Sequence, residues 1–451
     1  MDWKRTKLKD LGWLRSAGVN KLSDSNHKEV QLLNYMDVYR NQKITNKIDF
    51  QSVTAKESEI KNANLEVGDI LFTPSSEKPT DIGHAGIVIE DLPNTVYSYH
   101  LVRFRPDNPQ FFNLHFLAYA LNSFNSEKHF ISRATGTTRY TLSKSDFKSL
   151  EFEYPENPAE QIAIATILSK VDEAIVSTKN SIKAAEKFKK ALMQNLLTGK
   201  LKPDGIWRTE DELMDTKYGY ASKDWKYCKI KDLIKEDYIT KVQDGNHGES
   251  HPVSAEFVEE GIPFVMASDI SKGFVDTENC KKITKKRADK LRIGFSIKGD
   301  VLLSHKASVG YTCIVEEADP YIMLTPQVTM YRVDPQKLIP EYLLYFFQLY
   351  TFQIILEGNA KQSTRNYIGI TNQKKMWIYL PKTTEEQEAL IKPIRKVDKE
   401  IINKEIKIQK LQRLKKALMQ NLLTGKVRLP KEFIAQFEDE IEVTNTTTTA
   451  Q

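Results

Sequence analysis

Short loops rich in polar and basic side chains are the part of this sequence that could recognise a chemical partner. Asparagine can hydrogen-bond to the edge of adenine, and arginine or lysine to the edge of guanine, when a loop presents them in a groove of DNA. Such loops are TPSSE (73–77), TGTTRY (135–140), DGNHGESHP (244–252), SHKAS (304–308) and KQSTRNY (361–367). Their composition indicates a surface able to read the bases of a nucleic acid.

Several side chains of these loops are candidate DNA-binding residues. Each also has a structural interpretation, because histidine and asparagine in tight loops often hydrogen-bond to the local backbone. The candidates are Thr138, Arg139, Tyr140, Asn246, His247, His305, Lys306, Thr364 and Arg365.

A basic stretch at 281–292 could contact the phosphate backbone. It holds seven lysines and arginines against the single acid Asp289, and such contacts add salt-dependent affinity without sequence information. Lys281, Lys285 and Arg287 are therefore further candidate DNA-binding residues, although a run of this kind can equally be a solvated face. Over the whole chain 66 basic residues stand against 60 acidic ones, a net charge of +6, so DNA binding would depend on local patches.

The loops lie between short stretches that have the composition of β-strands. β-Branched and aromatic residues are typical of strands, and turn residues separate them. Residues 112–123 and 340–350 are each apolar enough to predict one short helix per domain. Strands are predicted within GDILF (68–72), AGIVIED (85–91), GIPFVM (261–266) and GDVLLSH (299–305). Mixed α+β domains follow from this alternation.

An internal repeat organises the whole chain. The string KKALMQNLLTGK occurs at 189–200 and again, letter for letter, at 415–426, an offset of 226 residues. Repeats of this kind are sought first because they decide the architecture. Further matches pair Pro155 with Pro381, Glu160-Gln161 with Glu386-Gln387, and Gly68-Asp69 with Gly299-Asp300. The chain therefore reads as two variable domains, each followed by a near-constant segment.

The near-constant segments have the pattern of long helices. Asn157 and Thr383 are predicted N-caps, and Gly199 and Gly425 are predicted C-terminal stops. At alternating steps of four and three residues, eight of ten positions are apolar in each copy, which indicates a coiled-coil seam. A helix of ~40 residues would be about 60 Å long, and burying both seams against each other predicts an antiparallel pair with two-fold symmetry. Two ordinary surface helices, each packed on its own domain, are the alternative.

These elements define a fold class and a linear order of domains. The prediction is an α+β protein in which two mixed α/β target-recognition domains are separated by a pair of long antiparallel coiled-coil helices, with a pseudo-two-fold internal repeat. The predicted segments are a first domain (1–154), a central helical spacer (155–203), a linker (204–224), a second domain (225–380), a C-terminal helical spacer (381–430) and a disordered tail (431–451).

Motifs of catalysis and of membrane proteins are absent from the 451 residues. There is no GxxxxGK[ST], HExxH or GxSxG motif, and NPQF at 108–111 only superficially matches an amino-methyltransferase motif. The three cysteines form no CxxC pair, and the apolar run at 162–168 is far shorter than the ~20 residues of a membrane span. With no secretory leader either, the sequence predicts a non-catalytic chain of the cytoplasm.

The repeat and its motifs resemble the specificity subunits of type I restriction-modification systems. The resemblance covers about residues 1–430 and depends on the duplicated LMQNLLTGK helix end, with DGNHG, GDVLLSHKASVG and QSTRNYIGI in the second domain. It implies a non-catalytic subunit that binds double-stranded DNA and reads a split target, with one half-site for each domain and helices that set the spacing between them. Because the two domains differ in sequence, the target is expected to be asymmetric.

The resemblance also implies partner subunits. Two modification subunits would carry S-adenosylmethionine and methylate adenine, while restriction subunits would use ATP and Mg²⁺ to translocate and cleave DNA, so this chain itself would hold no cofactor. A freestanding DNA-binding coiled-coil adaptor without methyltransferase partners is the alternative. A self-contained nuclease or methyltransferase is disfavoured by the missing cofactor loops.

Overall fold

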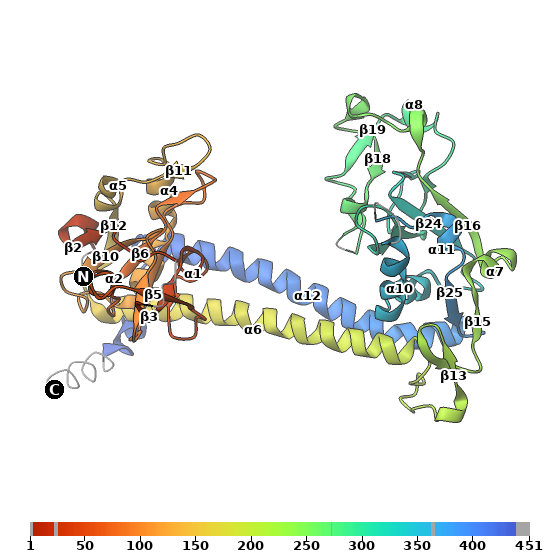
Figure 1. The fold of residues 1–451 in the computed structure, drawn as a ribbon, viewed down its shortest axis with the longest axis horizontal. Coiled ribbons are helices and arrows are strands. Elements are labelled where there is room, and N and C mark those ends of the chain that lie inside the picture. The colour runs from red at the N-terminus through yellow and green to blue at the C-terminus, as the bar shows by residue number, and fades with distance from the viewer. Residues whose placement is uncertain (1–2, 22–25, 272, 362–365, 439–451) are drawn as a thin grey trace. The chain divides into compact units, whose positions relative to one another are not determined.

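The computed structural model describes residues 3–21, 26–271, 273–361 and 366–438. The chain forms two compact units. One unit comprises Met1–Lys179 with Ile406–Gln451, and the other comprises Asn180–Glu405. Each unit therefore contains one mixed domain together with parts of both long helices, α6 (Pro158–Leu196) and α12 (Thr384–Leu422) (Figure 1).

Unit 1 carries the first mixed domain. Its central sheet has five strands in the order β2-β10-β6-β8-β4, and a three-stranded sheet has the order β5-β3-β9. The strands are β1 (Trp3–Lys7), β2 (Gly12–Arg15), β3 (Lys28–Leu33), β4 (Lys43–Ile44), β5 (Gln51–Ala55), β6 (Ile70–Phe72), β7 (Ser75–Ser76), β8 (Ala85–Val88), β9 (Thr95–Tyr97), β10 (Val102–Pro106), β11 (Tyr140–Thr141) and β12 (Glu151–Pro155). The short helices are α1 (Tyr35–Arg40), α2 (Glu57–Ala63), α3 (Leu114–Leu121), α4 (Phe124–Ile131), α5 (Lys144–Lys148) and α13 (Lys431–Ala435).

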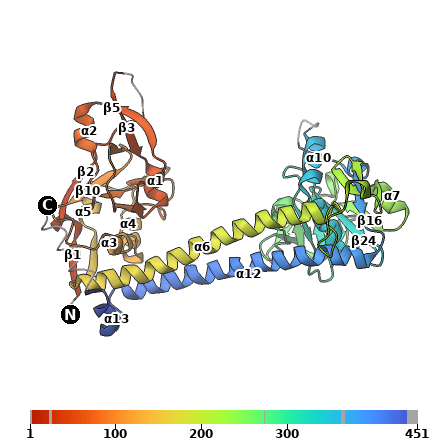
Figure 2. The same cartoon turned by 90° about the horizontal axis from the view of Figure 1, so that it is seen from below.

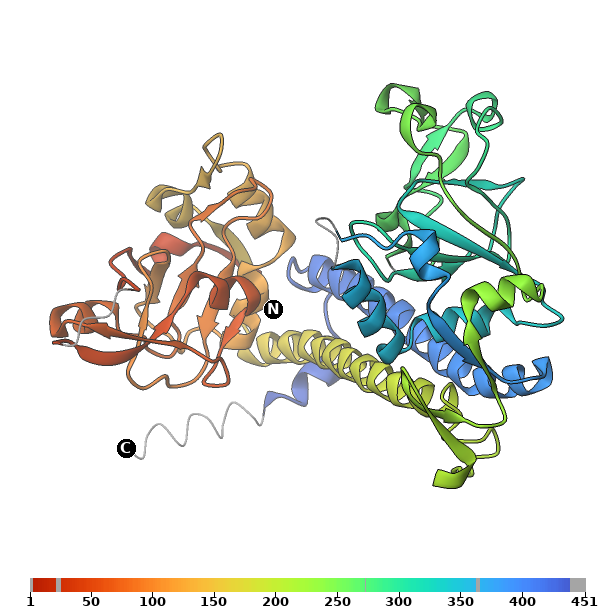
Figure 3. The ribbon, with the colours of Figure 1, turned by 45° about the vertical axis from the view of Figure 1, so that its right-hand side comes forward.

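Unit 2 carries the second mixed domain, which Figure 3 brings forward. Its sheets include a four-stranded one in the order β16-β24-β21-β22 and a five-stranded one in the order β17-β19-β18-β23-β20. The strands are β13 (Leu213–Thr216), β14 (Gly219–Ser222), β15 (Lys226–Lys229), β16 (Ile239–Asp244), β17 (Phe257–Val258), β18 (Ile262–Val265), β19 (Lys281–Ile283), β20 (Phe295–Ser296), β21 (Val301–Ser304), β22 (Thr312–Ile314), β23 (Ile322–Leu324), β24 (Val328–Val333) and β25 (Trp377–Leu380). The short helices are α7 (Ile230–Lys235), α8 (Lys285–Ala288), α9 (Pro340–Phe347), α10 (Tyr350–Ala360) and α11 (Ile370–Gln373).

The elements predicted from composition are present, but the domains hold more helix than expected. The four predicted strands correspond to β6, β8, β18 and β21, and the two predicted short helices correspond to α3 and α9. The expectation of one short helix per domain is wrong, because helices such as α4 and α10 follow α3 and α9 after only two residues. The predicted stretches end at 123 and 350, so they omit α4, whose sequence FNSEKHFI is mostly polar, and all of α10 except Tyr350.

The two long helices run antiparallel in each unit (Figure 2). In unit 1, Asp172 near the start of α6 forms an ion pair of 2.7 Å with Lys415 near the end of α12. In unit 2, Asp398 near the start of α12 forms an ion pair of 2.6 Å with Lys189 near the end of α6. The two pairs are related by the repeat offset, so the predicted antiparallel pairing of the helices and the internal repeat are confirmed.

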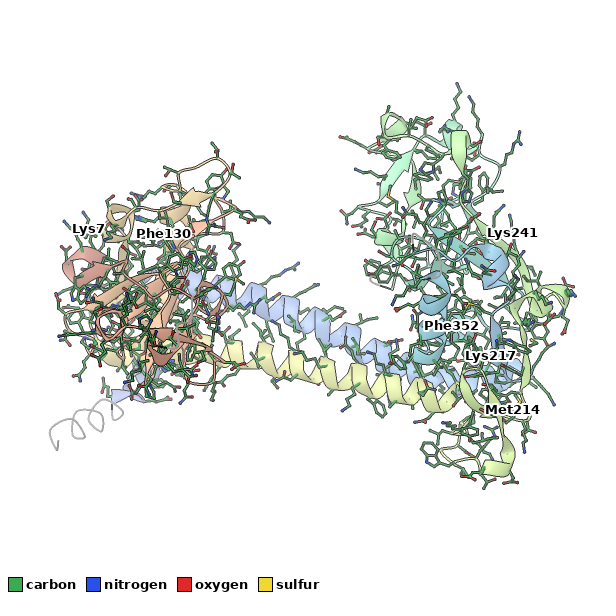
Figure 4. The ribbon with its side chains drawn as sticks, in the orientation of Figure 1. Lys7, Phe130, Met214, Lys217, Lys241 and Phe352 are labelled. Carbon is green, nitrogen blue, oxygen red and sulfur yellow. The ribbon has the colours of Figure 1, made fainter. Side chains whose placement is uncertain are left out.

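Each domain buries its core against the start of one long helix and the end of the other. The core of unit 1 includes Ile164 and Leu168 of α6 together with Leu422 of α12. The core of unit 2 includes Leu390 and Ile394 of α12 together with residues from the end of α6. Phe130 and Phe352, labelled in Figure 4, belong to these two cores. A helix end that is buried on a domain in this way has a fixed direction relative to that domain.

The end of each long helix lies against a tryptophan next to a short strand, since Trp3 begins β1 and Trp225 immediately precedes β15. Gly425, just past α12, has a left-handed φ of 65° and lies against the ring of Trp3, while Gly199, with a φ of 70°, lies against Trp225. A side chain at either glycine would collide with these contacts, which is why the LTGK ending carries glycine. The predicted helix stops at Gly199 and Gly425 are therefore confirmed.

The tail that was expected to be disordered begins with an ordered helix. Residues 431–435 form α13, and Ile434 is buried in unit 1. The expectation of disorder is wrong for this part of the tail, because an apolar side chain within a polar sequence finds a partner surface. Residues 439–451 lie outside the described residues.

Candidate nucleic-acid interface

In the first domain, hydrogen bonds of Thr73 and Pro74 hold the candidate loop that follows β6. Thr73 follows β6, and its hydroxyl accepts a hydrogen bond of 3.0 Å from the backbone N–H of His84. The backbone of Thr73 donates to the carbonyl of His84 at 3.0 Å and accepts from the N–H of Gly83 at 3.1 Å. Pro74 then accepts from the N–H of Leu142 at 2.9 Å. These four bonds hold the loop 74–82 beside the loop 135–141.

The second domain repeats this arrangement. Ser304 is the last residue of β21, and its hydroxyl accepts a hydrogen bond of 2.8 Å from the N–H of Tyr311. Its backbone donates to the carbonyl of Tyr311 at 2.8 Å and accepts from Gly310 at 3.0 Å. The carbonyl of His305 accepts from Ile368 at 3.0 Å. We call each set of four bonds a loop framework. The two frameworks bring together the loop pairs that were singled out in the sequence.

A glycine closes both frameworks. Gly83 and Gly310 have φ values of 81° and 102°, in the region that glycine favours. A Cβ atom would lie 2.4 Å from the ring of Phe130 in the first case and 2.2 Å from the side chain of Gln353 in the second. Both the backbone conformation and the close packing therefore require glycine here, which keeps the two turns alike although their loops differ.

A buried carboxylate anchors the strand that leads into each framework. Asp69 receives two hydrogen bonds from Arg105, at 2.7 and 2.6 Å. Asp300 receives two from Arg332, both at 2.8 Å. Both carboxylates are 1% exposed, and such two-pronged arginine contacts fix geometry as well as adding energy. The Gly-Asp motif found in both halves of the sequence thus positions β6 and β21.

Several predicted residues lie exposed on these loops. Arg139 donates to the hydroxyl of Ser75 at 3.3 and 3.1 Å across the first loop pair. Thr138 and Lys306 are exposed, and Tyr140 is partly buried where β11 pairs with β7. These side chains are placed where a nucleic acid could reach them, and their DNA-binding roles stay predictions.

Two predicted base readers are instead inside the second domain. Asn246 is 4% exposed and its amide accepts a hydrogen bond from Arg292 N–H at 3.3 Å. His305 is fully buried, and its Nδ1 lies 2.7 Å from the hydroxyl of Thr329. Burial lowers the pKa of His305 to about 4. The expectation that these side chains read bases is corrected, because both are used to hold loops in place.

The remaining candidates divide between exposed, paired and undescribed positions. His247 is exposed, and its Nε2 lies 2.9 Å from Asp244. Lys281 is exposed on β19, and Lys285 is exposed but forms an ion pair of 2.6 Å with Asp289. Arg287 forms an ion pair of 2.5 Å with Glu256 and donates to a backbone carbonyl, so part of its charge is already compensated. Thr364 and Arg365 lie outside the described residues.

Some residues of the site were not found from the sequence. His84 and Tyr311 share one position in the two frameworks, because each donates its backbone N–H to the hydroxyl of Thr73 or Ser304. His84 lies 2.8 Å from Asp81, whose other oxygen accepts from Tyr39 at 3.0 Å. The repeated Gly83 and Gly310 just before them could have pointed to this position, but the loops differ in length and conceal the match.

The site shows no grouping that would hold a metal. Among the described residues no group of three or more His, Cys, Asp or Glu side chains is placed to bind a metal ion. A search over the same part of the chain finds no helix that is both long and apolar enough to cross a membrane. Cys280 and Cys313 are buried, and burial raises the pKa of the Cys280 thiol to about 11.

Comparison with protein families places these two domains. The type I restriction modification DNA specificity domain matches residues 1–187 and 222–413, which are the two halves of the repeat. The chain belongs to this family. Because the specificity-domain match includes the first part of each long helix as well as each mixed domain, the repeat unit is a domain with its helix.

Curated relatives with this specificity domain are distant in sequence. The chain is 24% identical over 305 residues to the type I restriction enzyme MjaVIII specificity subunit of Methanocaldococcus jannaschii, covering 66% of this chain and 67% of the relative. It is also 24% identical over 382 residues to the putative MjaX specificity subunit of the same organism, covering 83% and 82%.

Solved structures of specificity subunits share the fold. The S subunit of a type I restriction-modification system from M. genitalium aligns with a TM-score of 0.52 at 14% identity, covering 94% of this chain and 96% of that one. A chain from a structure of type I R-M complex assembly and conformational transition aligns with a TM-score of 0.55 at 16% identity, covering 94% and 98%. These likenesses support the antiparallel helices and paired domains as the family's architecture.

Proposed function

We propose that this chain is the DNA-reading subunit of a type I restriction-modification complex and that it recognises a two-part, asymmetric target. The observation that carries the proposal is the pair of matched loop frameworks, which hold loops of different length and chemistry. Residues 74–82 span the first framework and only 305–309 span the second. Because the two frameworks have the same hydrogen bonds, both domains are expected to bind DNA in the same orientation. Because their loops differ, the two domains are expected to read different half-sites.

The chemical steps would be carried out by partner subunits. Modification subunits with S-adenosylmethionine would methylate adenine, and restriction subunits with ATP and Mg²⁺ would cleave DNA, all in the cytoplasm. The relatives are named specificity subunits of restriction enzymes, which supports a non-catalytic role. A freestanding DNA-binding adaptor is not favoured, because the specificity-domain match extends over both halves of the chain.

A chimera would test the two-part target. Replacing residues 1–154 by a second copy of residues 225–380 should change an asymmetric target into an inverted repeat of one half-site. The modification complex would be expressed with wild-type chain or chimera, and methylated adenines mapped across the host genome. An unchanged target in the chimera would contradict the assignment of one half-site to each domain, and a complex without any two-part target would contradict the function.

Two copies of one modification subunit would bind this chain through matched cavities. In unit 1 a cavity of about 600 Å³ lies between Met419 and Gln420 of α12 and Phe124 at the start of α4. In unit 2 a cavity of about 510 Å³ lies between the end of α6 and Tyr350 at the start of α10. Phe124 is 53% exposed and Tyr350 is 70% exposed. Exposed aromatic side chains beside a cavity are typical of protein interfaces.

The stoichiometry can be tested by native mass spectrometry of the assembled complex. The wild-type chain should bind two modification subunits, Tyr350→Ser should bind one, and Tyr350→Ser with Phe124→Ser should bind none at the same concentration. Tyr220→Ser is the matched control, since Tyr220 is 54% exposed and lines neither cavity. Two bound subunits in the double variant would show that the cavities are not the docking sites.

A further inference from the structure

The two loop frameworks differ most in chemistry at one shared position. The residue after the framework glycine donates its backbone N–H to the hydroxyl of Thr73 in domain 1 and of Ser304 in domain 2. That residue is His84 in the first case and Tyr311 in the second. The backbone at this position is therefore held by the same bonds, while the side chain is different.

Both side chains reach the surface. The side chain of His84 is 31% exposed and that of Tyr311 belongs to a residue that is 40% exposed. In domain 1, Arg139 and Ser75 lie in the adjacent loop pair, and in domain 2 Lys306 pairs with Tyr367 at the same place. A side chain that is exposed, held by its backbone and surrounded by polar loop residues has the properties required for base recognition.

We propose that His84 and Tyr311 are equivalent specificity-determining residues, each contacting a base in the half-site of its own domain. The inference rests on the proposed function, since it presupposes that each domain reads DNA. It assigns one residue in each domain to the difference between the half-sites, and in the second domain Tyr311 takes the role that was expected of the buried Asn246 and His305.

The surroundings of His84 define what it can read. Its Nε2 lies 2.8 Å from Asp81, and a carboxylate can only accept a hydrogen bond, so the proton is on Nε2. In the neutral ring Nδ1 is then an acceptor. The ring of Tyr39 packs edge-on at 4.9 Å and limits its rotation. With a neutral ring, this acceptor in the major groove would match the amino group of adenine or cytosine, whereas a protonated ring would donate to an acceptor such as guanine N7.

Tyr311 has a different capability. Its hydroxyl can both donate and accept, and the ring is carried by a backbone that is bonded on both sides to Ser304. The variant Tyr311→Phe removes this hydroxyl and keeps the ring, so it separates hydrogen-bond reading from packing. His84→Ala removes the imidazole and leaves the backbone bonds of the framework in place.

The test maps adenine methylation by the complete modification complex with four chains: wild type, His84→Ala, Tyr311→Phe and Tyr311→Ala. His84→Ala should lower the preference for the cognate base roughly ten-fold or more at one position of one half-site and leave the other half-site unchanged. The Tyr311 variants should do the same in the other half-site only. His115→Ala and Tyr220→Phe, which change exposed side chains outside the frameworks, should leave both half-sites as in wild type.

The unaltered half-site reports on folding in each variant, because one intact domain must still select its sequence. Unchanged preferences in His84→Ala and in both Tyr311 variants would overturn the inference while the function stands. Equal loss in both half-sites would also overturn it, since it would show a general weakening of the complex. A wild-type complex without a two-part target would overturn the proposed function itself.

Discussion

His305 shows how a single side chain in a recognition loop can serve the fold. It is fully buried beneath the loop at 304–308, with Nδ1 beside Thr329 and Asp244 4.0 Å from Nε2. Burial is the main reason that its pKa is lowered to about 4, and the nearby Asp244 opposes the shift. The backbone carbonyl of the same residue belongs to the loop framework. The charge state of His305 is thus linked to the stability of the domain.

This linkage predicts a loss of stability in acid. An unfolded histidine has a pKa of about 6.5, whereas the folded value is about 4, so between these values the unfolded chain binds a proton that the folded chain does not. The free energy of unfolding should therefore fall as pH falls, by about 2 kcal/mol more in wild type than in His305→Gln between pH 7 and pH 5. Urea unfolding of both proteins at the two pH values measures the difference.

A control for this experiment is Gln336→Asn, since Gln336 is exposed in the same domain and carries no ionisable group. It should keep the wild-type dependence on pH. Parallel curves for wild type and His305→Gln would show that His305 is charged or solvated in the folded protein.

At the scale of elements, each unit has one group of an aspartate, a tyrosine and a lysine that joins its domain to both long helices. We call each group a clamp. In unit 1, Asp172 of α6 accepts from Tyr119 of α3 at 2.8 Å and pairs with Lys415 of α12. In unit 2, Asp398 of α12 accepts from Tyr345 of α9 at 2.8 Å and pairs with Lys189 of α6. Each lysine also lies 5.3 Å from the ring of its tyrosine. Lys189 and Lys415 interrupt the apolar seam, so each clamp gives the helix pair one preferred register.

Charge exchange in one clamp should reveal this preference. Asp398→Lys places two lysines together in a partly buried site and should lower the free energy of unfolding by about 2 to 3 kcal/mol. Adding Lys189→Glu should restore at least half of the loss. The same exchange in the exposed pair Glu357–Lys361, as Glu357→Lys with Lys361→Glu, should change it by less than about 0.5 kcal/mol. Additive effects in the Asp398–Lys189 cycle would mean that the clamp does not set the register.

At the scale of the whole molecule, each unit is assembled from segments that are far apart in the sequence. The first domain uses the C-terminal end of the chain, since Arg428 donates to the buried carboxylate of Glu160 at 2.7 Å through two nitrogens. In the second domain the equivalent Glu386 accepts from the indole of Trp225 at 2.9 Å. Anchoring at both ends supports the prediction that the length of the helices sets the number of base pairs between the two half-sites.

Lengthening both helices should lengthen the gap in the target. The ion pairs Asp172–Lys415 and Lys189–Asp398 place Lys179 opposite Ile408. Seven residues inserted after Lys179 and seven before Ile408 would keep the seam in phase and add about 10 Å, close to three base pairs of ~3.4 Å each. Mapping of methylated adenines should then show a gap about three base pairs longer. As a control, a seven-residue insertion after Asp204, outside both helices, should leave the gap unchanged. An unaltered gap in the double insertion would contradict the idea that helix length sets the gap.

Much of the fold was predictable because its signals are local or repeated. The strands around Gly68-Asp69 and Gly299-Asp300, the helices α3 and α9, and both long helices have patterns that their own residues define. The predicted N-caps are also confirmed, since Asn157 accepts from Ala159 N–H at 2.9 Å and Thr383 from Glu386 N–H at 3.3 Å. The candidate site was less predictable, because polar loops look alike whether they face solvent or the core.

By itself the sequence determined the two-fold repeat, the class of each domain and the pairing of two long helices, since periodicity and identity within one chain require no knowledge of neighbours. Only the tertiary structure decided that His305 and Asn246 are buried and that His84 and Tyr311 share one framework position. The same is true of Lys189 and Lys415, which interrupt the seam in sequence but meet Asp398 and Asp172 in space. The physical reason is that burial and charge pairing depend on residues distant in the sequence, from 24 positions for His305 and Thr329 to 243 for Asp172 and Lys415, whose approach is set by packing.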